Sequence, residues 1–399
     1  MRTTPLTAAL AAAVFVPALS ISVAARDAQT FTVDCSRGQM IGKALELGDA
    51  RKPLVLIIRG TCNENVMINR DDVTVQGDPK SGAVINGTTA SSTITVRASR
   101  VLIDRLTVRG GNPNGIALIG GSNVDISNSD VQYAGGQGIN VTGTSSVNIT
   151  NCTVQHNTNA GVGVQQASVA ITDSRISFNS GAGVIGVWDG SIVIENSEIA
   201  SNATSGVRAI RHSSLTVAAS TISSNGQLGV ELRTSEANIN GTTITANGTG
   251  GIGAGSSNFQ VNGGAITNNL GAGVSASGPG FTGLNNSAVT GNGGSNGAVS
   301  LYLGATGSIN GGTISGNSTS GVWVWVNSTV QISGGATVQT NAGHGIQLNA
   351  DSKLWMNGPA TVGGNAGFGL NCLDTGSSAY NLASITYSPS NGAGTTNCM

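Results

Sequence analysis

Apolar residues recur at every second position in short runs along most of the chain, as in Val147-Asn148-Ile149 and Ile192-Val193-Ile194. A period of two is typical of β-strands and not of helices. From Gly115 onward the runs return about every 23 residues, each after a Gly that is followed by an apolar residue. These opening glycines are Gly115, Gly138, Gly161, Gly183, Gly206, Gly229, Gly251, Gly273, Gly297, Gly321, Gly345 and Gly369. A fixed period of this length predicts a stacked array in which each unit buries its apolar face against the next. We therefore interpret each unit as one coil of an all-β, single-stranded parallel β-helix with three parallel sheets.

Polar residues keep the same register and predict the corners of the coil. Nine coils carry Asn four residues before the opening Gly: Asn157, Asn179, Asn202, Asn225, Asn247, Asn269, Asn317, Asn341 and Asn365. Stacked Asn side chains can hydrogen-bond to one another and to turn backbone, so we expect a single Asn ladder. Five residues ahead of this row lie small residues, and just before them come Asn, Asp or Gly, which tolerate left-handed backbone. The small row is Ser129, Cys152, Ser174, Ser197, Ser220 and Thr242; the residues before it include Asn128, Asn151, Asp173, Asn196, Gly241 and Gly263.

The N-terminal region predicts a cap on the first coil. Residues 31–34 have the pattern of a short strand, and Ser36-Arg37-Gly38-Gln39 has the form of a capping box. We expect a short helix to follow through about Leu47, because a bare β-helix end exposes unpaired backbone and core side chains. Strands of the first coils are predicted at 54–59, 66–68 and 73–76.

Four segments follow from this pattern. Residues 1–25 are interpreted as a signal peptide, with an apolar stretch at 6–16 and a small-residue cleavage site at 23–25. Residues 26–100 form the N-terminal cap and first coils, 101–373 the regular coils, and 374–399 a Ser-, Asn- and Gly-rich C-terminal cap. A mature chain released in this way is secreted or periplasmic, where disulfides form.

The five cysteines agree with an oxidising compartment. Cys35 and Cys62 flank the first elements, and Cys372 and Cys398 flank the tail, so we predict one disulfide at each end. Cys152 occupies the small-residue row, where Ser replaces it in other coils, and is predicted to be a buried free thiol.

Composition narrows the classes of function. Only 9% of residues are charged, and the 18 Lys and Arg nearly balance the 19 Asp and Glu. There is no basic stripe, so we expect no nucleic acid partner. No second apolar segment is long enough to span a bilayer. No Cys pair has metal-ligand spacing, so we expect no cofactor.

The register, the Asn ladder and the N-terminal cap resemble the right-handed parallel β-helix superfamily, the pectin-lyase-like fold. The resemblance covers nearly the whole mature chain and implies that it binds extended polysaccharide along the outside of one sheet. We expect the chain to be a monomer. It does not fix a reaction, because this fold hosts lyases, hydrolases, epimerases and adhesins. Gly343-His344-Gly345 resembles a polygalacturonase motif, but the Asp pairs and the downstream basic motif are missing and Gly345 already opens a coil. The calcium-binding Asp cluster of pectate lyases is not apparent, so calcium is left open without a clear site.

One charged cluster stands out. Arg208 and Glu231 hold the same position in neighbouring coils, and so do Asp189 and His212. The stacking interval of about 4.8 Å brings such pairs together. We expect Asp189 to orient His212 as a general base, while arginines neutralise a uronate carboxylate. The candidate catalytic residues are Asp189, Arg208, Arg211, His212, Glu231 and Arg233, with Trp188 beside Arg211 as a binding residue. The alternative is that these residues are cross-coil pairs that tie strands together.

An aromatic cluster shares that sheet. Trp323 and Trp325 have outward parity, and Tyr302 lies beside Trp325 if the coil at Gly297 holds one extra residue. The next coil presents Gln347 and Asn349. Aromatic rings beside amides suit stacking on sugar faces with hydrogen bonds to hydroxyls. The alternative is that a C-terminal loop covers these rings.

We therefore expect a β-helix protein that engages extended polysaccharide, with a lyase acting on a uronate polymer as the leading version. The clustering of charged residues on one face favours that version. The alternative is a non-catalytic surface, adhesin-like or structural protein, which the scarcity of ionisable residues favours.

Overall fold

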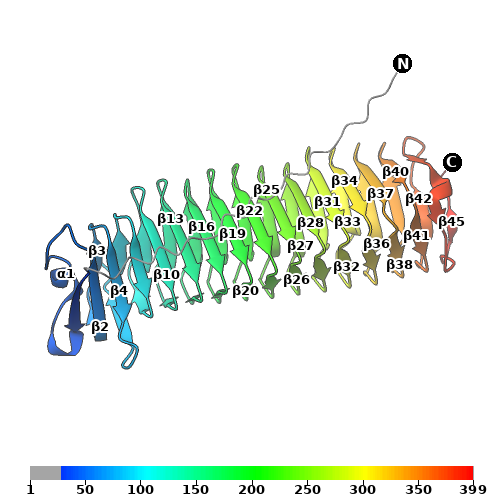
Figure 1. The fold of residues 1–399 in the computed structure, drawn as a ribbon. Coiled ribbons are helices and arrows are strands. Elements are labelled where there is room, and N and C mark those ends of the chain that lie inside the picture. The colour runs from blue at the N-terminus through cyan, green and yellow to red at the C-terminus, as the bar shows by residue number, and fades with distance from the viewer. Residues whose placement is uncertain (1–27, 399) are drawn as a thin grey trace, which may run out of the picture.

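The computed structural model describes residues 28–398 as a parallel β-helix, a rod of stacked coils (Figure 1). Each coil gives one strand to each of three parallel faces, called sheets A, B and C in chain order around the coil. Sheets A and B are joined at one end, because β2 (Leu54–Asn63) runs through both. The signal peptide expected over residues 1–25 lies outside the described residues.

The strands pair coil to coil in strict sequence. Sheet A consists of β1 (Gln29–Asp34), β2, β4 (Val73–Gly77), β7 (Val101–Asp104), β10 (Asn123–Ser127), β13 (Ser146–Thr150), β16 (Ser168–Thr172), β19 (Ser191–Glu195), β22 (Ser214–Ala218), β25 (Glu236–Asn240), β28 (Asn258–Asn262), β31 (Phe281–Asn285), β34 (Thr306–Asn310), β37 (Thr329–Ser333), β40 (Lys353–Asn357) and β43 (Ser378–Tyr380). Sheet B consists of β2, β5 (Ala83–Gly87), β8 (Thr107–Gly110), β11 (Asp130–Gln132), β14 (Thr153–Gln155), β17 (Arg175–Ser177), β20 (Glu198–Ala200), β23 (Thr221–Ser223), β26 (Thr243–Thr245), β29 (Ala265–Thr267), β32 (Ala288–Thr290), β35 (Thr313–Ser315), β38 (Ala336–Gln339), β41 (Ala360–Gly363) and β44 (Ile385–Thr386). Sheet C consists of β3 (Val66–Ile68), β6 (Ile94–Val96), β9 (Ile116–Leu118), β12 (Ile139–Thr142), β15 (Val162–Gln165), β18 (Val184–Val187), β21 (Val207–Ile210), β24 (Leu228–Arg233), β27 (Gly250–Gly255), β30 (Val274–Ser277), β33 (Gly297–Tyr302), β36 (Ser320–Trp325), β39 (Ile346–Asn349), β42 (Phe368–Cys372) and β45 (Gly394–Thr396).

The core lies inside the coils and is built by alternation along each strand. In β21, Val207 and Ala209 are fully buried while Arg208 and Ile210 face outward. The same inward position in successive coils of sheet A is filled by Ile149, Ile171, Ile194, Val217, Ile239 and Val261, all fully buried. Burying one such side chain contributes about 1.5–3 kcal/mol to the stability of the fold. Every coil therefore favours the register that keeps this position inside.

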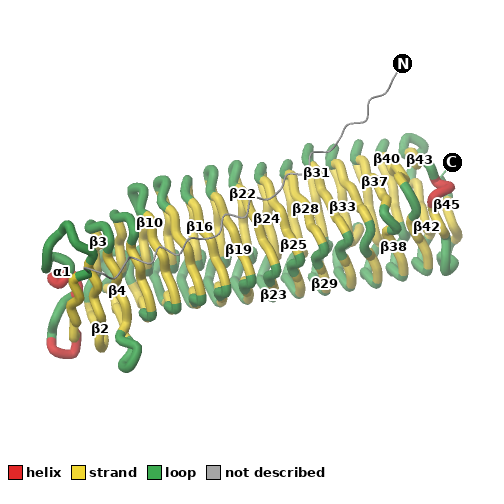
Figure 2. The backbone as a smooth tube through the Cα atoms, viewed as in Figure 1, coloured by secondary structure: helices red, strands yellow, loops and turns green. Residues whose placement is uncertain are grey.

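The predicted Asn ladder is confirmed at the corner between sheets B and C. Each Asn donates from its side-chain amide to Oδ1 of the Asn in the next coil, and its backbone N–H donates to the same oxygen. In the middle of the ladder, Asn202 does so to Asn225 at 3.0 and 3.1 Å. Asn292 and Asn391 also belong to the ladder, although the fixed four-residue offset did not reveal them. The loops that carry these corners follow one another along the rod (Figure 2).

The corner between sheets A and B has the predicted left-handed backbone. Asn128, Asn151, Asp173 and Asn196 all have positive φ. In the small-residue row beside them, Ser174 Oγ accepts a hydrogen bond from the N–H of Cys152, one coil earlier. Cys152 is a free, buried thiol, as expected.

The N-terminal cap differs from the prediction in its start and length. The helix α1 covers only Ile41–Ala44 and follows a 3-10 turn η1 (Cys35–Arg37). The prediction that residues 36–39 form a capping box is wrong. The hydroxyl of Ser36 donates to Asp34, and Gln39 Oε1 accepts from the N–H of Asp34, so both side chains serve the preceding strand.

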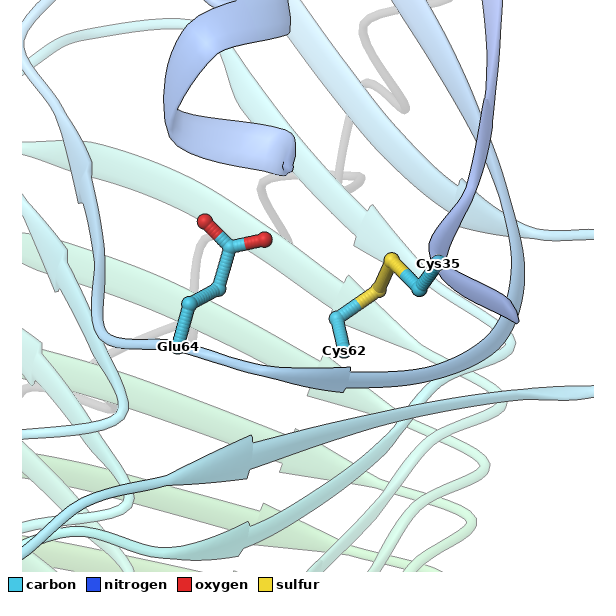
Figure 3. A group of neighbouring side chains, drawn as sticks. All are labelled: Cys35, Cys62 and Glu64. Atoms are coloured by element: carbon cyan, nitrogen blue, oxygen red, sulfur yellow. A yellow bond between two sulfur atoms is a disulfide. The ribbon is translucent and has the colours of Figure 1, made fainter. Parts of the chain in front are cut away.

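The helix is capped instead from the next coil. The carboxylate of Glu64 accepts hydrogen bonds from the N–H groups of Ile41 and Gly42 at 2.6 and 3.0 Å, and Figure 3 shows it pointing at the helix. A carboxylate at a helix N-terminus satisfies free donors and is favoured by the helix dipole. Ile41 and Ala44 are buried, so α1 covers the first coil as expected.

Both predicted disulfides are present. Cys35 pairs with Cys62 beside Glu64, and Cys372 pairs with Cys398 in the C-terminal coil. Each fixes an end of the rod, where a coil has a neighbour on one side only. A second 3-10 turn, η2 (Leu382–Ser384), lies in the last coil. Within residues 28–398, no helix is both long and apolar enough to cross a membrane.

Candidate functional site

The outer face of sheet C carries a groove with a volume of about 740 Å³. Glu231 and Arg233 line one end of it, and Tyr302, Trp323 and Trp325 line the other. Glu231 and Arg233 of the predicted charged cluster therefore share one concave surface with the aromatic cluster. The cross-coil register separates β24 from β36 by four intervals, or about 19 Å.

Small residues make the floor between the two ends. The outward positions of β27 are Gly253 and Gly255, and those of β30 are Ser275 and Ser277. Because these side chains stand much lower than the Arg and Trp side chains on either side, the sheet surface sinks in the middle. The hydroxyls of the floor leave it polar and uncharged.

An irregular corner makes one wall of the groove. Asn292 precedes Gly297 by five residues, whereas the other ladder residues in regular coils precede their Gly by four. The added residue lengthens the segment Gly293–Asn296, in which Gly294 has φ of 97°. Ser295 and Asn296 are exposed and line both this groove and a second hollow of about 390 Å³ beyond Trp323.

The second hollow extends the concave surface toward the C-terminus. Trp323 lines both hollows and stands between them. Gln347 and Asn349 line the second one, as expected from their place in the next coil, and Gln347 Oε1 accepts a hydrogen bond from Ser320 at 3.2 Å. The two hollows together form a surface elongated along the rod.

At the charged end, two arginines converge on one buried carboxylate. The Nε atoms of Arg208 and Arg233 lie 2.8 Å from Oε2 and Oε1 of Glu231, and Ser205 donates to Oε2 at 3.1 Å. The Arg208 Nε–H is not aligned with that oxygen despite the short distance; its aligned bond runs from Nη2 to Oε1 at 3.5 Å. The Glu231 side chain is 7% exposed and that of Arg233 is 70% exposed. The two arginines and Glu231 together carry a net charge of +1, and Arg233 presents this charge to solvent.

The other predicted members of the charged cluster lie elsewhere. Trp188, Asp189, Arg211 and His212 occupy the corner between sheets C and A, all with positive φ, and none lines the groove. Arg211 stacks on Trp188 with its guanidinium carbon 4.7 Å from the ring centroid. Asp189 and His212 are both described, yet no hydrogen bond joins their side chains.

The expected hydrogen bond between Asp189 and the predicted general base His212 is thus not formed. Backbone register does bring the two coils together here, with the Asp189 N–H donating to Arg211 O at 3.2 Å. At the left-handed corner, however, the side chains turn outward into solvent. The alternation of inward and outward side chains that holds along a strand does not fix their direction there.

At the aromatic end, the rings of Trp323 and Trp325 stack with centroids 5.1 Å apart. Tyr302 pairs with Trp325 in the sheet, so the coil does contain the extra residue that the prediction required. The Tyr302 hydroxyl lies 3.5 Å from Ser275 Oγ on the floor. The three rings are half-buried, and among the described residues that line the two hollows none lies beyond Leu373. The C-terminal segment therefore leaves the aromatic end open.

His344 has a structural position. Its Nδ1 accepts a hydrogen bond from the N–H of Phe368 at 2.9 Å, and its ring stacks on that of Phe368 at 6.0 Å. Burial lowers the pKa of His344 below its ordinary value of 6.5. His344 thus supports a turn and lines neither hollow, whereas Gly343 beside it lines the second one.

The ligand-rich group at the N-terminus offers no metal site. Within residues 28–398, the one grouping of potential metal ligands is Cys35, Cys62 and Glu64. The two sulfurs are bonded to each other, and the carboxylate already binds the end of α1 (Figure 3).

Sequence reasoning missed three parts of this site. It did not identify Ser205 as a partner of Glu231, the small floor residues, or the wall at Ser295 and Asn296. The wall could have been found from the sequence, because the spacing between opening glycines rises from 22 to 24 residues at Gly297. It also missed an exposed row on the corner after sheet B, where Tyr133, His156 and Phe178 stack at 5.4 Å.

Comparisons with known proteins agree with this architecture. A family model described as "Right handed beta helix region" matches residues 57–188 and 114–263. Together these ranges span more than half of the 399 residues. None of the curated proteins compared with the chain matches it.

Two similar solved structures are A-modules of Azotobacter vinelandii mannuronan C-5 epimerases. For AlgE4 the identity is 16%, the TM-score 0.54, and the match covers 80% of this chain and 93% of that one. For AlgE6 the identity is 16%, the TM-score 0.53, and the coverage 85% and 94%. At this identity the likeness concerns the fold.

Proposed function

The chain belongs to the right-handed β-helix family, and on that premise we propose that it binds an extended polysaccharide along the groove of sheet C. The observation that carries the proposal is the groove itself, with stacked indoles at one end and an exposed guanidinium at the other. Aromatic faces bind the apolar faces of sugar rings, and hydroxyls and amides bind sugar hydroxyls. The two structures of the same fold that are named as mannuronan epimerases support this proposal, because mannuronan is a polysaccharide.

The shape favours a long ligand over a small one. The groove runs along the rod and continues past Trp323 into the second hollow. Both are open to solvent on the outer face of a sheet, so a chain can enter at either end. A polymer lying parallel to the rod would contact Arg233, the Ser floor and Trp323 in turn.

Binding without cleavage is the version that the geometry supports best. Both oxygens of Glu231 are occupied by Arg208, Arg233 and Ser205, and no other carboxylate lines the groove among the described residues. The sequence-predicted base, His212, lies outside it. This corresponds to a surface or adhesin-like role, in which the coils position a binding face.

Elimination at a uronate is the second candidate, favoured by the two arginines at the charged end. In that reaction a base removes the proton beside the carboxylate, its electron pair forms the C4–C5 double bond, and the C4–O bond breaks with protonation of the leaving oxygen. Arg233 would stabilise the charge that develops on the carboxylate. The test is incubation with pectin, alginate and glycosaminoglycans while the ultraviolet absorbance of the new double bond is followed. A rise that Arg233→Gln abolishes would establish the lyase; no rise with any polymer would leave binding alone.

The binding proposal is tested by isothermal calorimetry with a panel of neutral and acidic polysaccharides. Trp323→Ala should weaken binding about tenfold or more, which corresponds to about 1.4 kcal/mol. The matched control is Trp355→Ala, because Trp355 is an exposed indole on sheet A, stacked on Tyr380 and outside the groove. Equal effects of the two substitutions would overturn the site.

We also propose that the protein acts as a monomer outside the cytoplasm, secreted or periplasmic. The two disulfides support an oxidising compartment. Fractionation of a tagged full-length chain, with mapping of the mature N-terminus, tests the compartment and the predicted cleavage near residue 25.

A further inference from the structure

Charge is distributed unevenly along the groove of sheet C. The charged residues that line the first hollow are Glu231 and Arg233, both at its N-terminal end, and no charged residue lines the second hollow. From β27 to β39 the outward positions of sheet C are Gly, Ser, Tyr, Trp, Gln and Asn. A ligand along the groove therefore meets one cationic position and a long uncharged surface.

The cationic position is preorganised for one carboxylate. Arg208 and Arg233 share the single charge of Glu231, which leaves one positive charge unbalanced. Nε of Arg233 lies 2.8 Å from Oε1 of Glu231, and its two terminal nitrogens donate no hydrogen bond to any residue within 28–398. A guanidinium with a free edge binds a carboxylate through two parallel hydrogen bonds, and Glu231 holds that edge in place.

The rest of the groove disfavours further anions. A carboxylate over the floor at Ser275 and Ser277 would lose water without gaining a cation. The faces of Trp323 and Trp325 carry negative electrostatic potential, which repels an anion and suits the C–H face of a neutral sugar. Arg233 and Trp325 are four coils apart, or about 19 Å. In a polymer of uronates alone, several carboxylates would lie within that distance.

We infer that the ligand is a predominantly neutral glycan carrying isolated uronate residues, with one uronate at Arg233 and neutral sugars over the floor and against Trp323 and Trp325. This inference rests on the proposed function, since it names the substrate class of the same groove. It separates this chain from binders of homopolymeric uronates, which need cations repeated along the groove.

The experiment compares four polymers by calorimetry at two salt concentrations. Glucuronoxylan is a neutral backbone with isolated uronates, unsubstituted xylan is its uncharged counterpart, and alginate and polygalacturonate are homopolymers of uronate. Glucuronoxylan should bind about tenfold more tightly than xylan at low salt, and both homopolymers should bind more weakly than glucuronoxylan. The advantage over xylan should shrink as salt rises, because it depends on one ion pair.

Two arginine substitutions assign the preference. Arg233→Gln should lower the affinity for glucuronoxylan to that for xylan, so that the difference between the two polymers disappears. Arg175→Gln is the control, because Arg175 is an exposed arginine outside the groove that pairs with Glu198 on sheet B. Thermal unfolding of each variant shows whether it is folded.

The outcomes separate the two proposals. Equal affinity for glucuronoxylan and xylan, or tighter binding of alginate or polygalacturonate, overturns the substrate class and leaves polysaccharide binding intact. Absence of binding to all four polymers and to the wider neutral and acidic panel overturns the proposed function itself.

Discussion

Arg208 and Glu231 are cross-coil neighbours, with Nε of the guanidinium 2.8 Å from Oε2 of a carboxylate that is almost fully buried. Residues in register on adjacent coils are held at the sheet spacing, so the pair is fixed by the backbone. Glu231 of this pair lines one end of the groove, where its second partner, Arg233, faces solvent.

The first prediction concerns the stability of this pair. Arg208→Met should lower the free energy of unfolding by about 1–3 kcal/mol, because Glu231 keeps a buried charge with one cation fewer, while the partial exposure of Arg208 reduces the loss. Urea denaturation measures it. Arg175→Met is the matched control: its pair with Glu198 is exposed on both sides, so the change should stay within about 0.5 kcal/mol. Similar losses in both variants would show that Glu231 gains little from Arg208.

The second prediction concerns the Asn ladder. Asn225→Ala removes the acceptor of the Asn202 amide and backbone N–H, and also the donor to Ile199 O at 3.1 Å. Buried groups left without partners cost about 1–3 kcal/mol each, so we expect a loss of about 3–5 kcal/mol in the free energy of unfolding. Asn238→Ala, on the exposed face of sheet A, should change it by less than about 1 kcal/mol. A small effect at Asn225 would mean that water replaces the ladder.

The third prediction concerns Trp325. Trp325→Ala should weaken glycan binding with little change in melting temperature, because the half-buried ring packs on Trp323 outside the core. A buried Trp would instead cost about 3–5 kcal/mol. Thermal unfolding and calorimetry on the same preparation separate the two cases. A large loss of stability with unaltered binding would identify the rings as structural.

The fourth prediction is a pH dependence from His344. Its pKa is lowered in the folded chain, so the folded state favours the neutral ring and the unfolded state binds the proton first. Stability from this group is present above the unfolded pKa of about 6.5 and declines as the pH falls below it. Denaturation midpoints between pH 7.5 and 5 should fall in the wild type and fall less in His344→Gln. An unchanged slope in His344→Gln would contradict the assignment of this pH dependence to His344.

The fifth prediction concerns Cys152. Burial raises the pKa of the Cys152 thiol to about 11, so little thiolate exists at neutral pH. Alkylation by iodoacetamide should be slow in the native protein and rapid in denaturant, as followed by mass spectrometry. Cys152→Ser should change stability by no more than about 1 kcal/mol, because Ser174 and Ser197 occupy the same row. Rapid native alkylation would contradict the core position.

Much of the candidate site could be anticipated where it lies on strands. Arg208 beside Glu231 and Tyr302 beside Trp325 both follow from counting outward positions along the period. Counting positions along the period did not place Asp189 and His212 correctly, because both lie past the last residue of a strand. It also missed Asn292, because one added residue shifts the count there. It also failed at α1, because the cap comes from Glu64, some twenty residues away in the sequence.

The sequence by itself determined the coil, its inward face, the Asn ladder and both disulfides. The coil, its inward face and the Asn ladder repeat by translation along the rod, so each contact joins like positions of neighbouring coils and the period is enough to specify it. The disulfides join the two cysteines that flank each end of the rod. Only the tertiary structure decided that the charged and aromatic clusters share one groove, and that His212 is outside it. Those facts depend on the heights of neighbouring side chains, such as Gly253 beside Glu231, and on the backbone conformation of individual corners. The side-chain heights differ from coil to coil, and at the left-handed corners the alternation of a strand does not fix the direction of a side chain, so a periodic pattern does not determine these facts.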